Sequence, residues 1–121
     1  MLRFDKIYKT RRVLFHMATV KILVEGYARE EGEEVFASPS TVLIEDSGKK
    51  VLVDPGTNKD LLLAALEKEG IKPEDIDILF LSHYHIDHTL NIRLFLNTPI
   101  YDGNTIYEGD KESFYENVIP G

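Results

Sequence analysis

Three of the four histidines of this chain lie within six residues, in the segment His83-Tyr84-His85-Ile86-Asp87-His88. The segment follows directly after the apolar run of residues 76–81. Imidazole nitrogens and carboxylate oxygens are the ligands that zinc, iron and manganese select in proteins. The spacing therefore predicts a transition-metal site with His83, His85, Asp87 and His88 as ligands.

A turn that leaves a strand keeps residues i and i+2 pointing roughly the same way, so we expect His83 and His85 to converge on one ion. Asp87 and His88 come slightly later and point to a neighbouring position, where they serve a second ion or the same one. A polar loop with incidental histidines is the alternative interpretation. The interleaved aspartate at the end of an apolar run favours the metal site.

The residues before this segment predict an α/β fold with a mixed sheet. Residues 20–24 are short, β-branched and apolar, as in a strand, and the acidic residues 29–34 predict a loop. The apolar runs 41–45 and 50–54 are separated by a polar turn that contains Gly48. They predict an antiparallel hairpin in the N-terminal part of the sheet.

A helix and a second kind of strand follow the hairpin. From Asn58, a plausible N-cap, the apolar residues repeat at helical spacing as far as Gly70, the expected stop. The run 76–81 is continuously apolar in its later half, which predicts a strand covered on both faces. Strand, helix and strand together predict a right-handed βαβ unit, with the histidine segment at the carboxyl end of a central strand, where open α/β sheets bind ligands. The remaining expected elements are a short helix or ordered loop at 89–96 and strands at 99–101 and 105–107.

The length and composition describe one globular domain at most. The chain has 121 residues, of which 43% are hydrophobic and 29% charged. No run approaches the roughly 18 apolar residues of a membrane span, and the N-terminus lacks the pattern of a signal peptide, so we expect a cytoplasmic protein and no membrane contact. Because there is no cysteine, any metal must be held by histidine and carboxylate.

The net charge of −7 is unevenly distributed. Residues 1–16 form a basic leader, which we expect to be a flexible tail, and Met17 is a candidate alternative start. Residues 17–121 hold 9 basic and 20 acidic residues, a balance that does not attract nucleic acid by bulk electrostatics, although the leader could bind RNA or DNA locally. The fourth histidine, His16, lies in the leader and is expected at the surface.

The histidine segment matches, position by position, the His-x-His-x-Asp-His signature of the metallo-β-lactamase superfamily, which this chain resembles. Val53-Asp54-Pro55-Gly56 is similar to the first motif of that family, and residues 88–91 and 97–101 are similar to the segment that its members carry next. The resemblance covers residues 18–121. It implies an αββα sandwich, of which residues 17–121 would be the N-terminal half, and a hydrolase that uses one or two metal ions.

The resemblance also implies roles for individual residues. His83 and His85 would bind the first metal, and Asp87 and His88 the second. Asp87 would also hold the nucleophile, a water whose pKa a bound dication lowers to about 7. Asp54 would orient a ligand or the bound water. The alternative interpretation is that Asp54 only forms the turn before Pro-Gly. These are the candidate catalytic and metal-binding residues; zinc is the favoured metal, with iron and manganese as alternatives.

The set of ligands is expected to be incomplete. A catalytic zinc has three protein ligands and an open position, and two residues for each ion are visible here. Family members supply a further histidine in a Pro-Gly-His-Thr type of turn, then a bridging aspartate and a final histidine. The sequence ends at Pro120-Gly121, and no histidine follows His88. The chain is therefore expected to be an N-terminal piece of a longer polypeptide, to be completed by a second chain or a second copy of itself, or to be a degenerate half-domain.

The function that these observations predict is hydrolysis of an ester, thioester, lactone or phosphodiester, most simply in a small-molecule substrate. The alternative is a non-catalytic module that binds metal or a partner. Of the two variable positions inside the signature, Ile86 is expected in the core, and Tyr84 is expected either to line a pocket or to pack.

Overall fold

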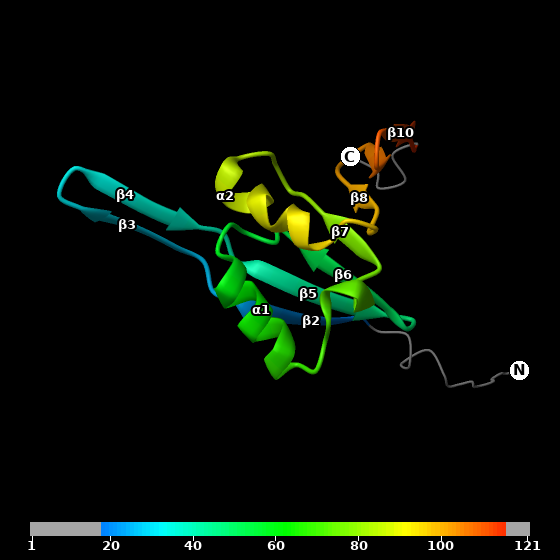
Figure 1. Ribbon diagram of the computed structural model, residues 1–121, viewed down its shortest axis with the longest axis horizontal. Helices are drawn as coiled ribbons and strands as arrows, with labels where there is room; N and C mark the ends of the chain where they lie inside the picture. The colour runs from blue at the N-terminus through cyan, green and yellow to red at the C-terminus, as the bar shows by residue number, and fades with distance from the viewer. Residues whose placement is uncertain (1–17, 116–121) are drawn as a thin grey trace, which may run out of the picture.

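The computed structural model describes residues 18–115, which form a seven-stranded mixed sheet, short helices and a separate two-stranded hairpin (Figure 1). The basic leader, Met17 and Pro120-Gly121 lie outside the described residues, so the expectations about them stay predictions. The sheet has the order β10-β9-β8-β7-β6-β5-β2. Its strands are β2 (Thr19–Val24), β5 (Thr41–Asp46), β6 (Lys49–Val53), β7 (Ile78–Phe80), β8 (Ile100–Tyr101), β9 (Thr105–Glu108) and β10 (Lys111–Phe114).

The expected hairpin is the pair β5 and β6, which run antiparallel with Asp46 opposite Lys49. Ser47 and Gly48 alone form the turn, and both have positive φ, at 54° and 79°. Two-residue turns with φ > 0 at both positions match the twist of the strands, and glycine adopts this conformation without strain. The hairpin and the mixed sheet are confirmed; β5 is one residue longer than predicted, and β6 has the predicted length but begins and ends one residue earlier.

The expected strand–helix–strand unit consists of β6, α1 (Lys59–Lys68) and β7, and the two strands are parallel. The side chain of Asn58 accepts a hydrogen bond from the Leu61 N–H at 3.0 Å and so caps the helix. Gly70, at φ +72°, lets the chain leave it. A short 3-10 turn, η2 (Pro73–Asp75), then leads into β7, the fourth of the seven strands.

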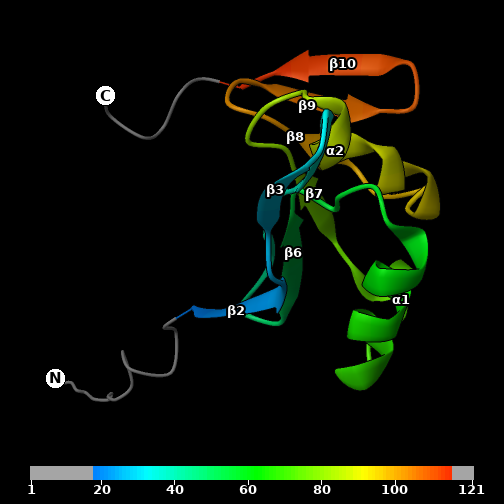
Figure 2. The same cartoon turned by 90° about the vertical axis from the view of Figure 1, so that its left-hand side faces the viewer.

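The hydrophobic core lies on one face of the sheet. Leu43, Leu52 and Leu79 are paired across β5, β6 and β7 and are at most 2% exposed. They pack with Leu62 and Leu66 of α1, and Figure 2 shows α1 and α2 on this same side of the sheet. The helical layer thus buries one leucine from each central strand.

The other face of the sheet carries apolar side chains that remain partly exposed. Val20 and Ile22 of β2 are 68% and 57% exposed, and the alternate residues of β5, β6 and β7 are half-buried. Within residues 18–115 no helix lies over this face. The prediction that 76–81 is covered on both faces is therefore wrong for the part of the chain that the structure describes, although the apolar run itself is there.

The acidic stretch 29–34 is not a loop, as the sequence predicts, but the tip of a hairpin. β3 (Tyr27–Glu31) and β4 (Glu34–Ser38) pair antiparallel, and Gly32, at φ +64°, lies in the two-residue turn between them. Nine of the ten strand residues are exposed. A hairpin with no buried face needs no alternation of apolar and polar residues, so the sequence lacks the pattern by which a strand is recognised. The hairpin projects from the body beside α2 (Figure 1).

The segment after the histidines is α2 (Ile86–Thr89) followed by the 3-10 helix η3 (Leu90–Leu94). A short helix is predicted correctly here, but it begins inside the histidine segment, three residues before the expected start. β8 and β9 then form the expected antiparallel pair. None of the helices in residues 18–115 is long and apolar enough to cross a membrane.

Candidate metal centre

The edge of the central strands positions the histidine segment. The parallel strands β7 and β8 end side by side, and the Leu81 N–H donates to the Tyr101 carbonyl oxygen at 2.9 Å just beyond them. Residues 82–85 form the loop that leaves this edge, and Ile86 begins α2. The His88 N–H donates to the His85 carbonyl oxygen at 2.9 Å. A strand end, a loop and one helical turn thus bring the histidines to the carboxyl edge, as the sequence predicts.

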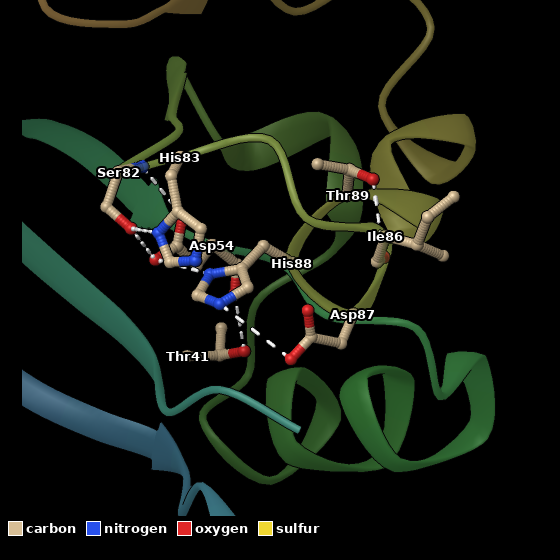
Figure 3. Close-up of polar contacts among 8 residues, drawn as sticks. All are labelled: Thr41, Asp54, Ser82, His83, Ile86, Asp87, His88 and Thr89. Carbon is tan, nitrogen blue, oxygen red and sulfur yellow. Dashed lines mark hydrogen bonds and ion pairs between the residues drawn. The ribbon is translucent and has the colours of Figure 1, made fainter. Parts of the chain in front are cut away.

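The three imidazole rings lie close together, and Figure 3 shows two of them, those of His83 and His88. The ring centroids of His83 and His85 are 4.8 Å apart at an interplanar angle of 85°, and those of His83 and His88 are 3.8 Å apart at 54°. The first two histidines are exposed, whereas the side chain of His88 is only 12% exposed. The segment therefore gathers its rings at one place rather than spreading them into solvent.

Asp54 lies under this cluster and holds the start of the loop. It is 6% exposed, and its Oδ1 accepts the Ser82 N–H at 2.9 Å while its Oδ2 accepts the Ser82 hydroxyl at 2.5 Å. Its backbone has φ +53°, a left-handed conformation in which aspartate is one of the better tolerated non-glycine residues. The sequence left two interpretations of Asp54 open, a turn former and a residue that orients the site; its left-handed backbone fits the first, and the second stays a prediction.

The hydrogen bonds of Ser82 determine which nitrogen of His83 is free. The Ser82 hydroxyl has one proton, which it donates to Asp54, so its contact of 3.2 Å with His83 Nδ1 has the ring as donor. His83 Nε2 is the ring nitrogen that does not face Ser82. Histidines that bind metals commonly donate their other ring N–H to a carboxylate or another polar group in this way.

His88 is placed similarly, between two carboxylates. Its Nδ1 lies 3.1 Å from Asp54 Oδ2, and its Nε2 lies 3.8 Å from Asp87 Oδ2. The first contact is close enough for an ion pair, but it lacks the alignment of a hydrogen bond, so Nδ1 is a buried polar atom without a hydrogen-bond partner. Asp54 thus reaches His88 directly and His83 through Ser82 (Figure 3).

The donor set fits a transition metal in chemical type, because it consists of imidazole nitrogens and a carboxylate. The positions of the side chains, in contrast, do not form a complete metal site. Within residues 18–115, no three histidine, aspartate or glutamate side chains are arranged so that they could together hold a metal ion. The assignment of His83, His85, Asp87 and His88 as ligands therefore stays a prediction.

A set of buried polar contacts, which we call the Asn91 clamp, joins the Asp54 loop to the helical turn that carries His88. Asn91 is 4% exposed; its side chain donates to the Pro55 carbonyl oxygen at 3.0 Å, and its N–H donates to the Gly56 carbonyl oxygen at 2.8 Å. The Gly56 N–H in turn donates to the His88 carbonyl oxygen at 3.2 Å. Sequence reasoning placed Asn91 in a family-like segment but gave it no role.

Thr41 is a second buried contact that sequence reasoning missed. Its hydroxyl is buried and donates to the Asp54 carbonyl oxygen at 2.7 Å. Thr41 is the first residue of an apolar strand, and a β-branched residue there carries no sequence signal beyond strand propensity. Its partner is 13 residues away in the chain, so only the folded hairpin reveals the contact.

The comparison with protein families agrees with this geometry. The model of the metallo-beta-lactamase superfamily matches residues 36–118. The chain belongs to this superfamily. A crystal structure of a metallo-beta-lactamase-like protein from Thermotoga maritima is similar at 30% identity, with a TM-score of 0.61 over 71% of this chain and 43% of that one.

Two curated relatives of this superfamily chain are informative. Metallo-beta-lactamase domain-containing protein 1 of Xenopus laevis is 32% identical over 84 residues, which cover 68% of this chain and 36% of the relative. An N-acyl homoserine lactonase of Bacillus cereus is 38% identical over 67 residues, covering 53% of this chain and 27% of that enzyme. The chain thus spans less than half the length of the relatives it matches. The comparisons support the α/β fold of the superfamily, whereas the roles of the individual site residues stay predictions.

The two variable positions of the superfamily motif are both exposed. Ile86 is 66% exposed, so its expected place in the core is wrong; it is the first residue of a four-residue helix whose residues are all at least partly exposed. Tyr84 is 58% exposed and lines a hollow beside His83, which agrees with one of its two expected roles.

Proposed function

We propose that this chain is the N-terminal part of a metal-dependent hydrolase of the metallo-beta-lactamase superfamily. The observation that carries the proposal is the gathering of His83, His85 and His88 over Asp54, at the carboxyl edge of the central strands. The similarity to an N-acyl homoserine lactonase supports a hydrolytic reaction. The substrate is an ester, thioester, lactone or phosphodiester, and the acidic body of the chain favours a small molecule over RNA or DNA.

In this proposal His83, His85, Asp87 and His88 bind one or two metal ions. Zinc is the preferred ion, and iron or manganese suits the same donors. A bound dication supplies Lewis acidity and an activated water nucleophile. His83 contributes Nε2, because its Nδ1 proton is held by Ser82.

Asp54 positions the ligands in this scheme rather than contacting the substrate. Its carboxylate is buried, holds the loop at Ser82 and lies 3.1 Å from His88 Nδ1. Partners of this kind fix the orientation of the ring and raise the basicity of the other nitrogen. Asp87, whose side chain is 32% exposed, is the carboxylate that can both bind metal and hold the nucleophile.

The remaining ligands come, in this proposal, from outside the described residues: from a longer polypeptide, from a second chain or from a second copy of this chain. A cytoplasmic location of the assembled enzyme is part of the same proposal.

Metal content and hydrolysis, measured on the same sample, test the proposal. After incubation with zinc and dialysis, the chain assembled with the part that supplies the remaining ligands should retain one to two ions and should hydrolyse p-nitrophenyl acetate or bis(p-nitrophenyl) phosphate. His83→Ala should lose both properties, whereas the matched control His16→Ala should keep them. A chain that retains no metal and turns over neither compound is the non-catalytic module that the sequence left as the alternative.

A further inference from the structure

A hollow of about 520 Å³ lies beside the histidine segment, and His83 is the one proposed metal ligand among the residues that line it. It is lined by residues 81–84, which leave β7, and by residues 102–104, which leave β8. Because β7 and β8 are parallel neighbours, both segments leave the sheet at the same edge. The hollow therefore adjoins the place where a substrate of the proposed hydrolase would react.

Asp102 is the charged group of the hollow, and only one of its carboxylate oxygens is well satisfied. Oδ1 accepts the N–H groups of Asn104 and Thr105 at 2.9 and 2.8 Å, which fixes the turn. Oδ2 has only the hydroxyl of Tyr107, at 3.4 Å, whereas good O–H···O bonds are about 2.5–3.0 Å long. This second oxygen can therefore accept a shorter hydrogen bond from a ligand.

Tyr84 supplies an aromatic surface to the same hollow. Its ring is 58% exposed, and its hydroxyl lies 3.4 Å from that of Tyr107. Tyr107 thus stands between Tyr84 and Asp102, with a long contact on either side. An exposed aromatic ring near a carboxylate that can accept a hydrogen bond is a combination suited to a cation.

The charged residues around the hollow also favour a cationic ligand. No lysine or arginine is among the residues that line it, and Asp54 and Asp87 lie in the neighbouring cluster. An anionic group placed beside Asp102 would meet its carboxylate, whereas a protonated amine would meet that carboxylate and the aromatic face of Tyr84 favourably.

We propose that this hollow binds a protonated amine of the substrate, with Tyr84 and Asp102 as the residues that determine specificity. The inference rests on the proposed hydrolase function and adds a substrate class to it. Substrates that carry an ammonium group near the bond to be cleaved are then preferred over otherwise identical substrates that carry a carboxylate.

Binding of small probes tests the hollow without any hydrolysis. We would titrate the full ¹⁵N-labelled chain with benzylamine, benzyl alcohol or benzoate and follow the amide signals. A chelator is present throughout, because an amine could also bind a metal. Benzylamine should shift the amides of residues 82–84 and 103–104 saturably, benzyl alcohol more weakly, and benzoate not at all. Benzoate binding at least as tightly, or shifts confined to other residues, would overturn the inference.

Variants separate the charge of the hollow from its shape. Asp102→Asn keeps an oxygen for the two backbone N–H groups but removes the charge, so it should raise the Kd of benzylamine about fivefold, as expected for a partly exposed ion pair. Asp110→Asn, in the exposed turn after β9, is the matched control and should change nothing. Tyr84→Phe should keep most of the affinity, and Tyr84→Ala should lose it. An Asp102→Asn chain that binds benzylamine as tightly as the original overturns the proposed role of Asp102.

Hydrolysis of paired esters then separates this inference from the proposed function. Two p-nitrophenyl esters of equal length, one ending in an ammonium group and the other in a carboxylate, are compared by kcat/KM. Preference for the ammonium ester, reduced by Asp102→Asn, supports both ideas. Hydrolysis with no such preference overturns the inference and leaves the hydrolase intact. Benzylamine binding at the hollow without hydrolysis of any ester supports the amine site and overturns the hydrolase.

Discussion

At the scale of single residues, Asp54 links the loop after β7 to the histidine cluster. It is a buried carboxylate, has a left-handed backbone and contacts both Ser82 and His88. Strained backbone at a polar, buried position persists only where the surrounding contacts stabilise it, and such residues cluster at functional sites. Its contacts hold the loop at Ser82, and in the proposed function they also orient His83 and His88.

Two substitutions of Asp54 should separate these tasks. Asp54→Asn keeps an oxygen for the Ser82 N–H and tolerates the left-handed backbone, so the protein should fold with nearly its original stability. Its zinc affinity should nevertheless fall by about 10–100-fold, as is typical when the partner of a metal-binding histidine is lost. Asp54→Ala should in addition lose about 1–3 kcal/mol for the unsatisfied N–H and roughly 1–2 kcal/mol for the backbone.

Urea unfolding and competition with a zinc chelator measure the two effects. If Asp54→Asn loses stability but keeps the zinc affinity of the original chain, Asp54 is only the turn former that the sequence offered as its alternative role.

At the scale of elements, the site depends on two segments that are far apart in sequence but are fastened together. The loop after β6 carries Asp54, and the turn of α2 carries His88. The Asn91 clamp fixes their separation through hydrogen bonds to the loop backbone at Pro55 and Gly56. Gly56 has φ +81° and lies close to Thr41 and Asn91, so the loop is held from both sides.

Asn91→Ala should therefore weaken both the fold and the site. It leaves the buried Pro55 carbonyl without its donor, which should lower the free energy of unfolding by about 1–3 kcal/mol. Because the Asp54 loop is then less well fixed, zinc affinity should fall in the same variant.

Asn97→Ala removes an exposed asparagine from the loop before β8 and is the matched control, with no expected effect on either quantity. Chemical denaturation and metal titration report the two effects. Equal behaviour of the two alanine variants would show that the clamp does not stabilise the site.

The elements also show what the sequence could and could not predict. Asn58, Gly48 and Gly70 act locally, so the helix α1 and the β5–β6 hairpin follow from the residue types. The β3–β4 hairpin was missed because neither of its faces is buried, and a strand without a buried face has no apolar alternation. The histidines were found by spacing, whereas Ser82, Thr41 and Asn91 act through contacts that only the folded chain creates.

At the scale of the whole molecule, the two faces of the sheet differ. The leucines of β5, β6 and β7 are buried under the helices, while the alternate residues on the opposite face remain partly exposed. Soluble proteins rarely expose contiguous apolar patches larger than a few hundred Å². This asymmetry agrees with the comparisons, in which the chain spans 36% of one relative and 43% of a solved structure.

Two neighbouring residues of β5 allow this asymmetry to be measured. Leu43 is 2% exposed and faces the helices, whereas Ile44 is half-buried and faces the other way. Leu43→Ala should lower the free energy of unfolding by about 2–5 kcal/mol, because it leaves a cavity in the core. Ile44→Ala should lower it by less than about 1 kcal/mol, because little apolar area is lost from contact.

Urea unfolding of the two variants at several protein concentrations is the measurement. If Ile44→Ala proves as destabilising as Leu43→Ala, the face is covered in solution. If the loss of unfolding free energy caused by Ile44→Ala grows with protein concentration, a second copy covers the face. If the loss does not depend on concentration, residues outside 18–115 cover it. In the first case the assembly contains a second histidine segment, as the proposal that a second copy supplies the remaining ligands requires.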